Sequence, residues 1–227
     1  MPTALVTGAG RGIGLATARA FLEEGWKVLA LDKQFGMEIA GERVDYDLTN
    51  LAGIPQLIGQ LSAIDTLVNN AGVLYCDPYE AIPEAHAAEI LTVNLRAPVA
   101  LIEALVPQMR QRMSGRIVNV GSVGAFTGHP DLWYGATKAA LLNITKSYAA
   151  SLGKDGVLVN AVAPGPTLTA MYDQLPQSRK DSVMKSVHAG RACTPEEVAR
   201  VIVWLGTSSP DYMSGATVDV SSGSYPR

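Results

Sequence analysis

Short apolar runs alternate with longer amphipathic stretches along most of the chain. The apolar runs predict strands over Ala4–Thr7, Lys27–Leu31, Arg43–Tyr46, Thr66–Val68, Arg116–Val120, Leu158–Val162 and Thr217–Val220. The amphipathic stretches predict helices over Gly12–Glu24, Leu51–Leu61, Ala87–Met113, Tyr134–Leu152 and Pro195–Leu205. Asn50 and Thr194 are suitable N-caps, and Pro195 suits the first position of a helix. Short apolar strands separated by helices are typical of a parallel sheet that is covered on both faces.

This alternation predicts a single doubly wound α/β domain over residues 1–227, with about seven strands and helices on both faces of the sheet. In such folds, ligands bind at the carboxyl ends of the strands. The segment 167–193 is the most polar and least periodic part of the chain. We expect it to form a lid over a substrate, and the alternative is a helical excursion on the surface.

Composition narrows the class of protein. The chain has 227 residues and a formal net charge of −3; 48% of its residues are hydrophobic, enough for a large core. It contains no basic block, which argues against a nucleic-acid partner. It shows no signal-peptide pattern and no uninterrupted apolar run that would span a bilayer, so we expect a cytoplasmic protein that does not bind membranes. Cys76 and Cys193 lack disulfide or metal spacing, and the three histidines are scattered, so we expect no metal site.

A glycine-rich loop directly follows the first predicted strand and opens the first predicted helix. Glycines in this position allow a tight turn, a close approach of the backbone to a pyrophosphate, and close packing of the helix on the sheet. The helix N-terminus also offers free N–H groups to a phosphate. This context predicts a Rossmann-type dinucleotide site formed by Gly8, Gly10, Arg11, Gly12, Ile13 and Gly14.

Asp32 ends the second predicted strand and bears on the choice of dinucleotide. A carboxylate at this position accepts hydrogen bonds from the ribose hydroxyls and repels a 2′-phosphate, which favours NAD(H) over NADP(H). Arg11 and Lys33 are the residues that could reach a 2′-phosphate instead. NADP(H) therefore stays open as the less favoured cofactor.

Tyr134 and Lys138 are four residues apart within a predicted helix, so they share one face of it. A free phenol has a pKa of about 10 and exchanges protons poorly at neutral pH. A neighbouring ammonium stabilises the phenolate and draws its pKa toward neutrality. The pair therefore predicts a proton-transfer device, whereas in isolation the same spacing also fits two solvated residues on a helix face.

Taken in chain order, these motifs resemble the short-chain dehydrogenase/reductase family over nearly the whole chain. The pattern Gly8-x-x-x-Gly12-x-Gly14 matches the family's glycine loop. The other matching segments are Asp47-Leu48, Asn69-Asn70-Ala71-Gly72, Asn94, Ser122, Tyr134 with Lys138, and Pro164-Gly165 followed by Thr167 and Thr169.

The resemblance implies a role for each matched position. Asn94, Ser122, Tyr134 and Lys138 correspond to the catalytic residues. The cofactor contacts implied outside the glycine loop are Asp32, Asp47, Leu48, Asn70, Ala71, Gly72, Tyr134, Lys138, Pro164, Gly165, Thr167 and Thr169. The implied activity is hydride transfer between NAD(H) and a small secondary alcohol or ketone by a homo-oligomer, a dimer or a tetramer. The alternatives are an NADP(H)-dependent ketoreductase similar to 3-oxoacyl reductases, a redox sensor that binds cofactor without turnover, and a scaffold.

Two departures from the family pattern point to the substrate. The segment Asp32 to Arg43 is too short for the usual helix, and Thr167 stands where many members carry an aliphatic residue. Both features are similar to the 2,3-dihydro-2,3-dihydroxybenzoate dehydrogenases, which points to a cyclic alcohol or diol. We expect a mixed aromatic and apolar substrate pocket with no fixed cation for a carboxylate. Its expected lining is Tyr75, Cys76, His129, Asp131, Leu132, Trp133, Tyr172 and Leu175.

Overall fold

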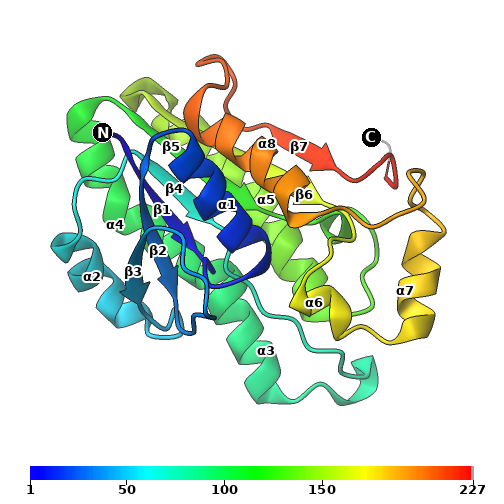
Figure 1. Ribbon diagram of the computed structural model, residues 1–227. Helices are drawn as coiled ribbons and strands as arrows, with labels where there is room; N and C mark the ends of the chain where they lie inside the picture. Colours follow the sequence, from blue (N-terminus) through cyan, green and yellow to red (C-terminus); the bar gives the residue numbers. More distant parts are fainter. Residues whose placement is uncertain (226–227) are drawn as a thin grey trace.

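A seven-stranded, fully parallel sheet forms the centre of the computed structural model, which describes residues 1–225 (Figure 1). Its strand order is β3-β2-β1-β4-β5-β6-β7. The strands are β1 (Thr3–Thr7), β2 (Lys27–Asp32), β3 (Glu42–Asp45), β4 (Thr66–Asn69), β5 (Gly115–Val120), β6 (Val157–Pro164) and β7 (Thr217–Val220). The chain reverses direction across the sheet between β1 and β4, so the predicted doubly wound Rossmann-type fold is confirmed.

Helices cover both faces of the sheet. The α-helices are α1 (Gly12–Glu23), α2 (Ile54–Gln60), α3 (Glu84–Leu91), α4 (Ala97–Arg112), α5 (Leu132–Leu152), α6 (Ala170–Asp173), α7 (Gln177–Met184) and α8 (Pro195–Thr207). α1 and α8 pack on one face, and α2, α4 and α5 pack on the other (Figure 1). Neighbouring residues of β1 serve both layers, because Leu5 belongs to one buried cluster and Val6 to the other.

The helix ends follow the local chemistry that the sequence predicts. The Asn50 side chain accepts a hydrogen bond from the backbone N–H of Gly53. Thr194 and Glu197 form a capping box at the start of α8, with Pro195 in its first turn. No helix separates β2 from β3, which confirms the abbreviated segment after Asp32.

The predicted helix Ala87–Met113 is two helices joined by a π-helical turn, η3 (Thr92–Arg96). The continuous helical run Glu84–Arg112 is long and apolar enough by length and composition to cross a bilayer, which the sequence analysis overlooked. Half of its most apolar window is buried inside the protein. The buried positions of α4 include Leu101, Leu105 and Met109, which belong to the core cluster on one face of the sheet.

The segment 167–193 leaves the layered body and returns to it at one place. Thr167 and Cys193 form an isolated parallel bridge, and the N–H of Cys193 donates to the carbonyl of Pro166 over 2.8 Å. Between these ends the chain forms α6 and α7, drawn in yellow in Figure 1. Both predicted alternatives, a lid and a helical excursion, are compatible with this geometry.

Candidate active site

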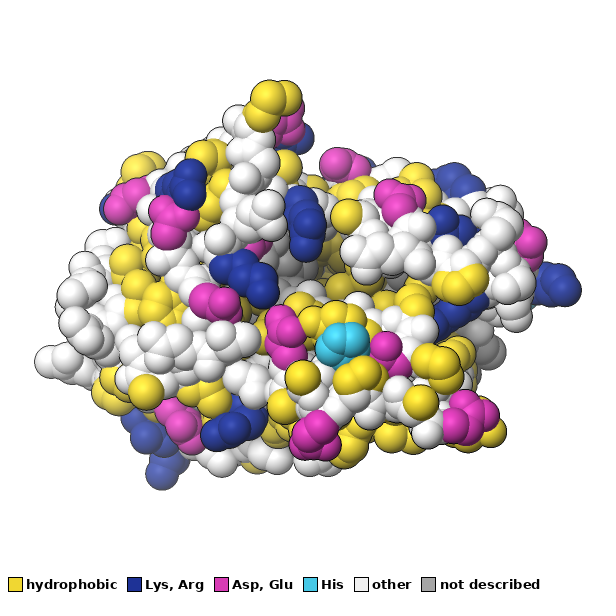
Figure 2. Space-filling model, turned by 90° about the horizontal axis from the view of Figure 1, so that it is seen from below, with side chains coloured by type: hydrophobic (Ala, Val, Ile, Leu, Met, Phe, Trp, Pro, Cys, Tyr) yellow, Lys and Arg dark blue, Asp and Glu magenta, His cyan; other side chains and the backbone are white. Residues whose placement is uncertain are grey.

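One cavity of about 660 Å³ lies at the carboxyl ends of the strands. Figure 2 views the molecule from below, where the hollow is bordered by charged side chains of both signs. Its lining comes from the segments that follow β1, β2, β3, β4, β5 and β6. The cavity therefore occupies the crevice where doubly wound sheets bind their ligands.

The glycine loop closes one end of this cavity. A Cβ atom on Gly14 would lie 2.0 Å from the carbonyl oxygen of Gly8, so only glycine lets α1 start this close to the loop. Arg11 is the N-cap of α1 and makes no side-chain capping bond. The N–H groups of the first helical turn are thus available to an anion, and the loop fits a dinucleotide pyrophosphate.

Asp32, the last residue of β2, contacts the glycine loop through its carboxylate. Its Oδ2 accepts from the N–H of Gly10 over 2.9 Å, and its Oδ1 accepts from the N–H of Gln34 over 3.1 Å. Lys33, the alternative ligand for a 2′-phosphate, has its Nζ 3.4 Å from a carboxylate oxygen of Glu89. The carboxylate is fixed by backbone, while the cation beside it is directed toward α3.

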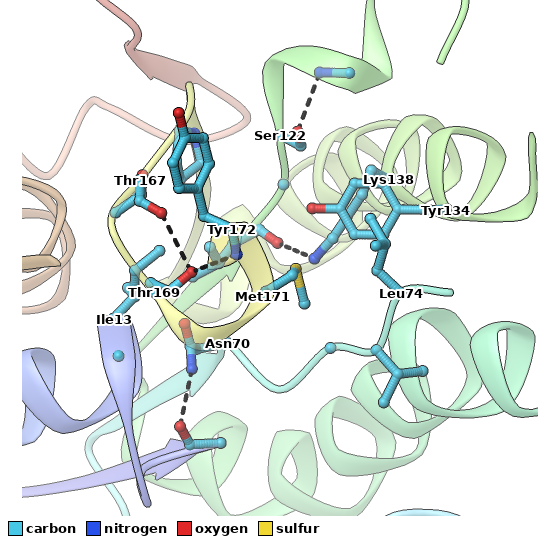
Figure 3. A pocket seen from close by; sticks show the side chains of 18 of the residues that line it. Ile13, Asn70, Leu74, Ser122, Tyr134, Lys138, Thr167, Thr169, Met171 and Tyr172 are labelled. Carbon is cyan, nitrogen blue, oxygen red and sulfur yellow. Dashed lines mark hydrogen bonds between the residues drawn. The ribbon is translucent and has the colours of Figure 1, made fainter. Parts of the chain in front are cut away.

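The proton-transfer residues meet in the middle of the cavity (Figure 3). Ser122 follows β5, its Oγ accepts from the N–H of Gly124 over 3.1 Å, and it is near enough to the Tyr134 phenol to lower the pKa of that group. Lys138 is buried, and its Nζ donates to the carbonyl of Val120 over 2.7 Å and lies 5.6 Å from the centre of the Tyr134 ring. The predicted helix face is therefore confirmed, with Tyr134 and Lys138 both pointing into the site.

The electrostatic prediction for this pair is wrong in the structure as it stands. Burial raises the pKa of Tyr134, and the bond from Ser122 only partly opposes that rise. Burial also lowers the pKa of Lys138 to about 8. Desolvation disfavours both the phenolate and the ammonium. The four-residue spacing shows that the two side chains share a helix face, but it does not show how strongly burial shifts their pKa values.

Lys138 makes the stability of the cofactor-free protein depend on pH. Its pKa is about 8 when folded and 10.5 ordinarily, so the unfolded chain binds more protons between these values. The free energy of unfolding should therefore rise with pH across this window. From pH 7.5 to 9.5, urea unfolding should show a rise about 1–2 kcal/mol larger in the parent than in Lys138→Met. Equal pH dependence in the two proteins would contradict the assignment.

Asn94 lies within the π-helical turn and binds the loop after β4. Its Oδ1 accepts from the N–H of Val73 over 2.8 Å, and its Nδ2 donates to the Val73 carbonyl over 2.9 Å. A Cβ added to Gly72 would lie 3.5 Å from Asn94 Oδ1 and 3.6 Å from Lys138 Nζ. Asn94 and Lys138 thus flank the same glycine. Lys138 lines the cavity, whereas Asn94 is buried and does not.

The two asparagines at the end of β4 connect neighbouring elements of the fold. Asn69 donates to the side-chain oxygen of Asn119, which in turn donates to Thr145 on α5, each over 2.9 Å. Asn70 donates to the carbonyl of Thr7 over 2.9 Å and ties the glycine loop to β4. These bonds pair the amide nitrogens of all three asparagines, while Asn69 Oδ1 has no partner among the described residues, and they place the loops that line the cavity.

The loop after β6 faces the proton-transfer residues across the cavity (Figure 3). Thr167 donates to the carbonyl of Gly165 over 3.0 Å. Thr169 caps α6 by accepting from the N–H of Tyr172, and a Cβ on Gly12 would lie 3.1 Å from its methyl group. The loop therefore connects the glycine loop to the segment 167–193.

Most of the predicted catalytic and cofactor-binding residues line this one cavity. The exceptions in that set are Gly10, Gly14 and Asn94. The members of the set that do line it are Gly8, Arg11, Gly12, Ile13, Asp32, Asp47, Leu48, Asn70, Ala71, Gly72, Ser122, Tyr134, Lys138, Pro164, Gly165, Thr167 and Thr169. Among residues 1–225, no group of histidine, cysteine or acidic side chains could hold a metal ion.

The far end of the cavity differs in part from the predicted substrate pocket. Tyr75, His129, Tyr172 and Leu175 line it as expected. Cys76, Asp131, Leu132 and Trp133 do not. The prediction of a pocket without a fixed cation is wrong, because Arg179 of α7 lines the cavity. Arg179 pairs with Asp131, 48 positions earlier, a separation that carries no local sequence signal.

Three comparisons place the chain among known proteins. A family model described as "Enoyl-(Acyl carrier protein) reductase" matches residues 8–224. The 3-oxoacyl-(acyl-carrier-protein) reductase of Thermotoga maritima is 32% identical over 96% of both chains. The galactitol 2-dehydrogenase of Agrobacterium fabrum is 33% identical over 98% of this chain and 96% of its own. A crystal structure of a proposed NAD(P)-dependent gluconate 5-dehydrogenase from Beutenbergia cavernae, with bound NADP, superimposes with a TM-score of 0.92 at 34% identity, covering 98% and 96% of the two chains.

Proposed function

Because the chain belongs to the short-chain dehydrogenase/reductase family and is an NAD(P)-dependent oxidoreductase of alcohols or ketones, we propose that Asn94, Ser122, Tyr134 and Lys138 form its catalytic set. One observation carries this proposal. The Tyr134 phenol, the Ser122 hydroxyl and the Lys138 ammonium converge in a cavity whose other end is the glycine loop. A redox sensor would need the loop but not these three groups.

The residues of the site divide the work of an alcohol oxidation. The nicotinamide, when bound, supplies hydride acceptance and donation. Tyr134 takes the proton of the substrate hydroxyl, or returns it to a ketone oxygen in the reverse direction. Ser122 donates to the same oxygen and stabilises the charge that develops there. The positive charge of the Lys138 ammonium stabilises the Tyr134 phenolate when the two groups face each other.

Asn94 acts in this proposal through position and solvent. Its amide fixes the Val73 backbone, which holds the loop that carries Gly72. The space beside Gly72, between Asn94 Oδ1 and Lys138 Nζ, suits a water molecule. Such a water would pass protons between Lys138 and solvent.

The proposed substrate is a cyclic or polyhydroxylated secondary alcohol, or the matching ketone. The test is turnover by the purified protein with NAD⁺ and NADP⁺ on a panel of secondary alcohols, and with NADH and NADPH on the matching ketones. Reduction of 3-oxoacyl substrates by NADPH alone would favour the second candidate, a ketoreductase. The 32% identity to a 3-oxoacyl-(acyl-carrier-protein) reductase supports that candidate. Cofactor binding without turnover on the whole panel would favour the sensor.

The proposed cofactor is NAD(H), on the strength of the Asp32 carboxylate. NADP(H) is the alternative, supported by the NADP bound to the Beutenbergia cavernae protein. Asp32→Ala should raise kcat/KM for NADP(H) relative to NAD(H) by about tenfold or more, because it removes a negative charge from the place of the 2′-phosphate. The ratio of the two kcat/KM values measures this. A parent enzyme that already prefers NADPH would contradict the proposal.

We also propose that the segment 167–193 is a substrate lid hinged at the Thr167–Cys193 bridge, and that the protein is a cytoplasmic homo-oligomer, a dimer or a tetramer. Light scattering of the purified protein tests the oligomer. Protection of α6 and α7 from hydrogen exchange on addition of cofactor and substrate tests the lid.

A further inference from the structure

Charged side chains divide the cavity into two chemically different ends. The carboxylates in its lining are Asp32, Asp47 and Glu89. Asp32 binds the glycine loop, whereas Glu89 of α3 pairs with Lys33 and accepts from the hydroxyl of Tyr75 over 2.5 Å. At the substrate end the lining includes Arg179, and the Glu89 carboxylate that reaches Tyr75 is occupied by the Tyr75 hydroxyl and Lys33. A substrate that reaches past Tyr134 therefore meets the guanidinium of Arg179.

Arg179 is held in place from behind. Its Nη2 donates to Oδ2 of Asp131 over 2.5 Å and lies 3.4 Å from Nε2 of His129. The Asp131 side chain is 4% exposed and that of Arg179 is 17% exposed, so this pair is largely withdrawn from water. The His129 ring in turn lies 5.0 Å from the Tyr134 ring. The guanidinium thus has a fixed position next to the proton-transfer residues.

The other edge of the same guanidinium has no acceptor among residues 1–225. An arginine carries five N–H donors, and Arg179 uses only Nη2 in its contacts with the described part of the chain. Val183 and Ser186 follow Arg179 at helical spacing and also line the cavity. Ser224, near the end of the chain, also lines the cavity, and its buried hydroxyl has no partner among the described residues. Arg179 and the Ser224 hydroxyl therefore leave hydrogen-bond donors without a partner among the described residues.

We propose that Arg179 is a specificity-determining residue that binds a carboxylate of the substrate, so that the reaction converts a hydroxy acid into the corresponding keto acid. The carbinol hydrogen leaves with the C–H electron pair as a hydride that the nicotinamide would accept. The O–H proton passes to Tyr134, and the O–H electron pair makes the C–O single bond a double bond. The carboxylate is unchanged. The proposal rests on the proposed function and narrows its substrate class.

A carboxylate suits this site better than a neutral hydroxyl. Its two oxygens only accept hydrogen bonds, and they match the planar fork of a guanidinium. Hydrogen bonds between two ionised groups are about twice as strong as neutral ones. Asp131 orients the guanidinium from the other side, in the way that one arginine bridges two carboxylates.

The test compares matched substrates that share a carbinol and differ in the carboxylate. D-Gluconate is paired with D-glucitol, and 3-hydroxybutyrate with 2-butanol. The parent should give the higher kcat/KM for the acid of at least one pair. In the double variant Arg179→Gln with Asp131→Asn, which leaves no unpaired buried charge, the acid-to-alcohol ratio of kcat/KM should fall about 10- to 100-fold. Arg179→Lys should recover part of it. The control is Lys185→Gln, an exposed cation at the end of α7, which should leave the ratio unchanged.

The outcomes separate this inference from the proposed function. A parent that oxidises the neutral alcohols as well as the acids, or a double variant that slows both members of a pair equally, overturns the role of Arg179 and leaves the dehydrogenase assignment intact. Absence of turnover on every substrate counts against the proposed function instead. Calorimetric titration of the two acids into protein saturated with NADH or NADPH still decides the inference in that case. Binding that the double variant loses supports it, and no binding to the parent overturns it.

Discussion

Tyr134→Phe should lower kcat for alcohol oxidation by about 10²–10⁴-fold, the usual contribution of a positioned acid–base group. The substitution removes one oxygen from a half-buried side chain and leaves the ring that packs against His129. Cofactor affinity should stay within about twofold of the parent, because the glycine loop and Asp32 are untouched. Fluorescence titration with NADH and steady-state kinetics measure the two quantities separately.

Tyr148→Phe is the matched control for this substitution. Tyr148 lies on the same helix, α5, but contacts the hydrophobic core and does not line the cavity. It should turn over at the parent rate. Near-normal turnover in Tyr134→Phe would remove the tyrosine from the mechanism, and a loss of cofactor binding would mean that its role is structural.

Gly14→Ala should abolish cofactor binding, with a fall in affinity of at least about 100-fold, and should destabilise the fold by about 2–4 kcal/mol. The added Cβ would lie 2.0 Å from the Gly8 carbonyl oxygen and 2.6 Å from Nδ2 of Asn70. Backbone atoms supply the closest contact, so relief requires α1 to move away from the loop. That movement would displace the N–H groups that face the phosphate.

Gly59→Ala separates this effect from the general cost of changing a glycine. Gly59 lies within α2, and a Cβ there would have no neighbour within 4 Å. It should raise the free energy of unfolding by about 0.5–1 kcal/mol and leave NAD(P)H binding unchanged. Urea unfolding and fluorescence titration of both variants test the pair. Parent-like affinity in Gly14→Ala would show that the loop does not need this close approach.

The strands and the core helices could be predicted because their signals are local. The central apolar runs are buried on both faces, as in β1 and β4, where every residue is buried, whereas β3 and β7 at the two edges of the sheet are largely exposed or half-buried. Capping residues such as Thr194 act within three or four positions of the chain. Glycine positions could also be interpreted, since the close contact of Gly14 with Gly8 involves residues of one short loop.

Features that depend on distant contacts could not be predicted in the same way. α7 has mostly polar residues and no buried position, so its sequence lacks an apolar stripe. The Arg179–Asp131 pair joins residues 48 positions apart, and nothing in the local sequence around either residue indicates its partner. The pKa values of Tyr134 and Lys138 are set first by burial, which depends on the completed fold.

The π-helical turn at Thr92–Arg96 makes this helix intolerant of changes in length. Its backbone N–H from Ala97 reaches back five residues to the carbonyl of Thr92, one residue further than in an α-helix. The turn is therefore equivalent to a single inserted residue. Deleting one residue here would rotate Asn94 by about 100° relative to α4 and separate its amide from Val73. Insertions and deletions should accordingly be tolerated least in the stretch whose sequence looks most like an uninterrupted helix.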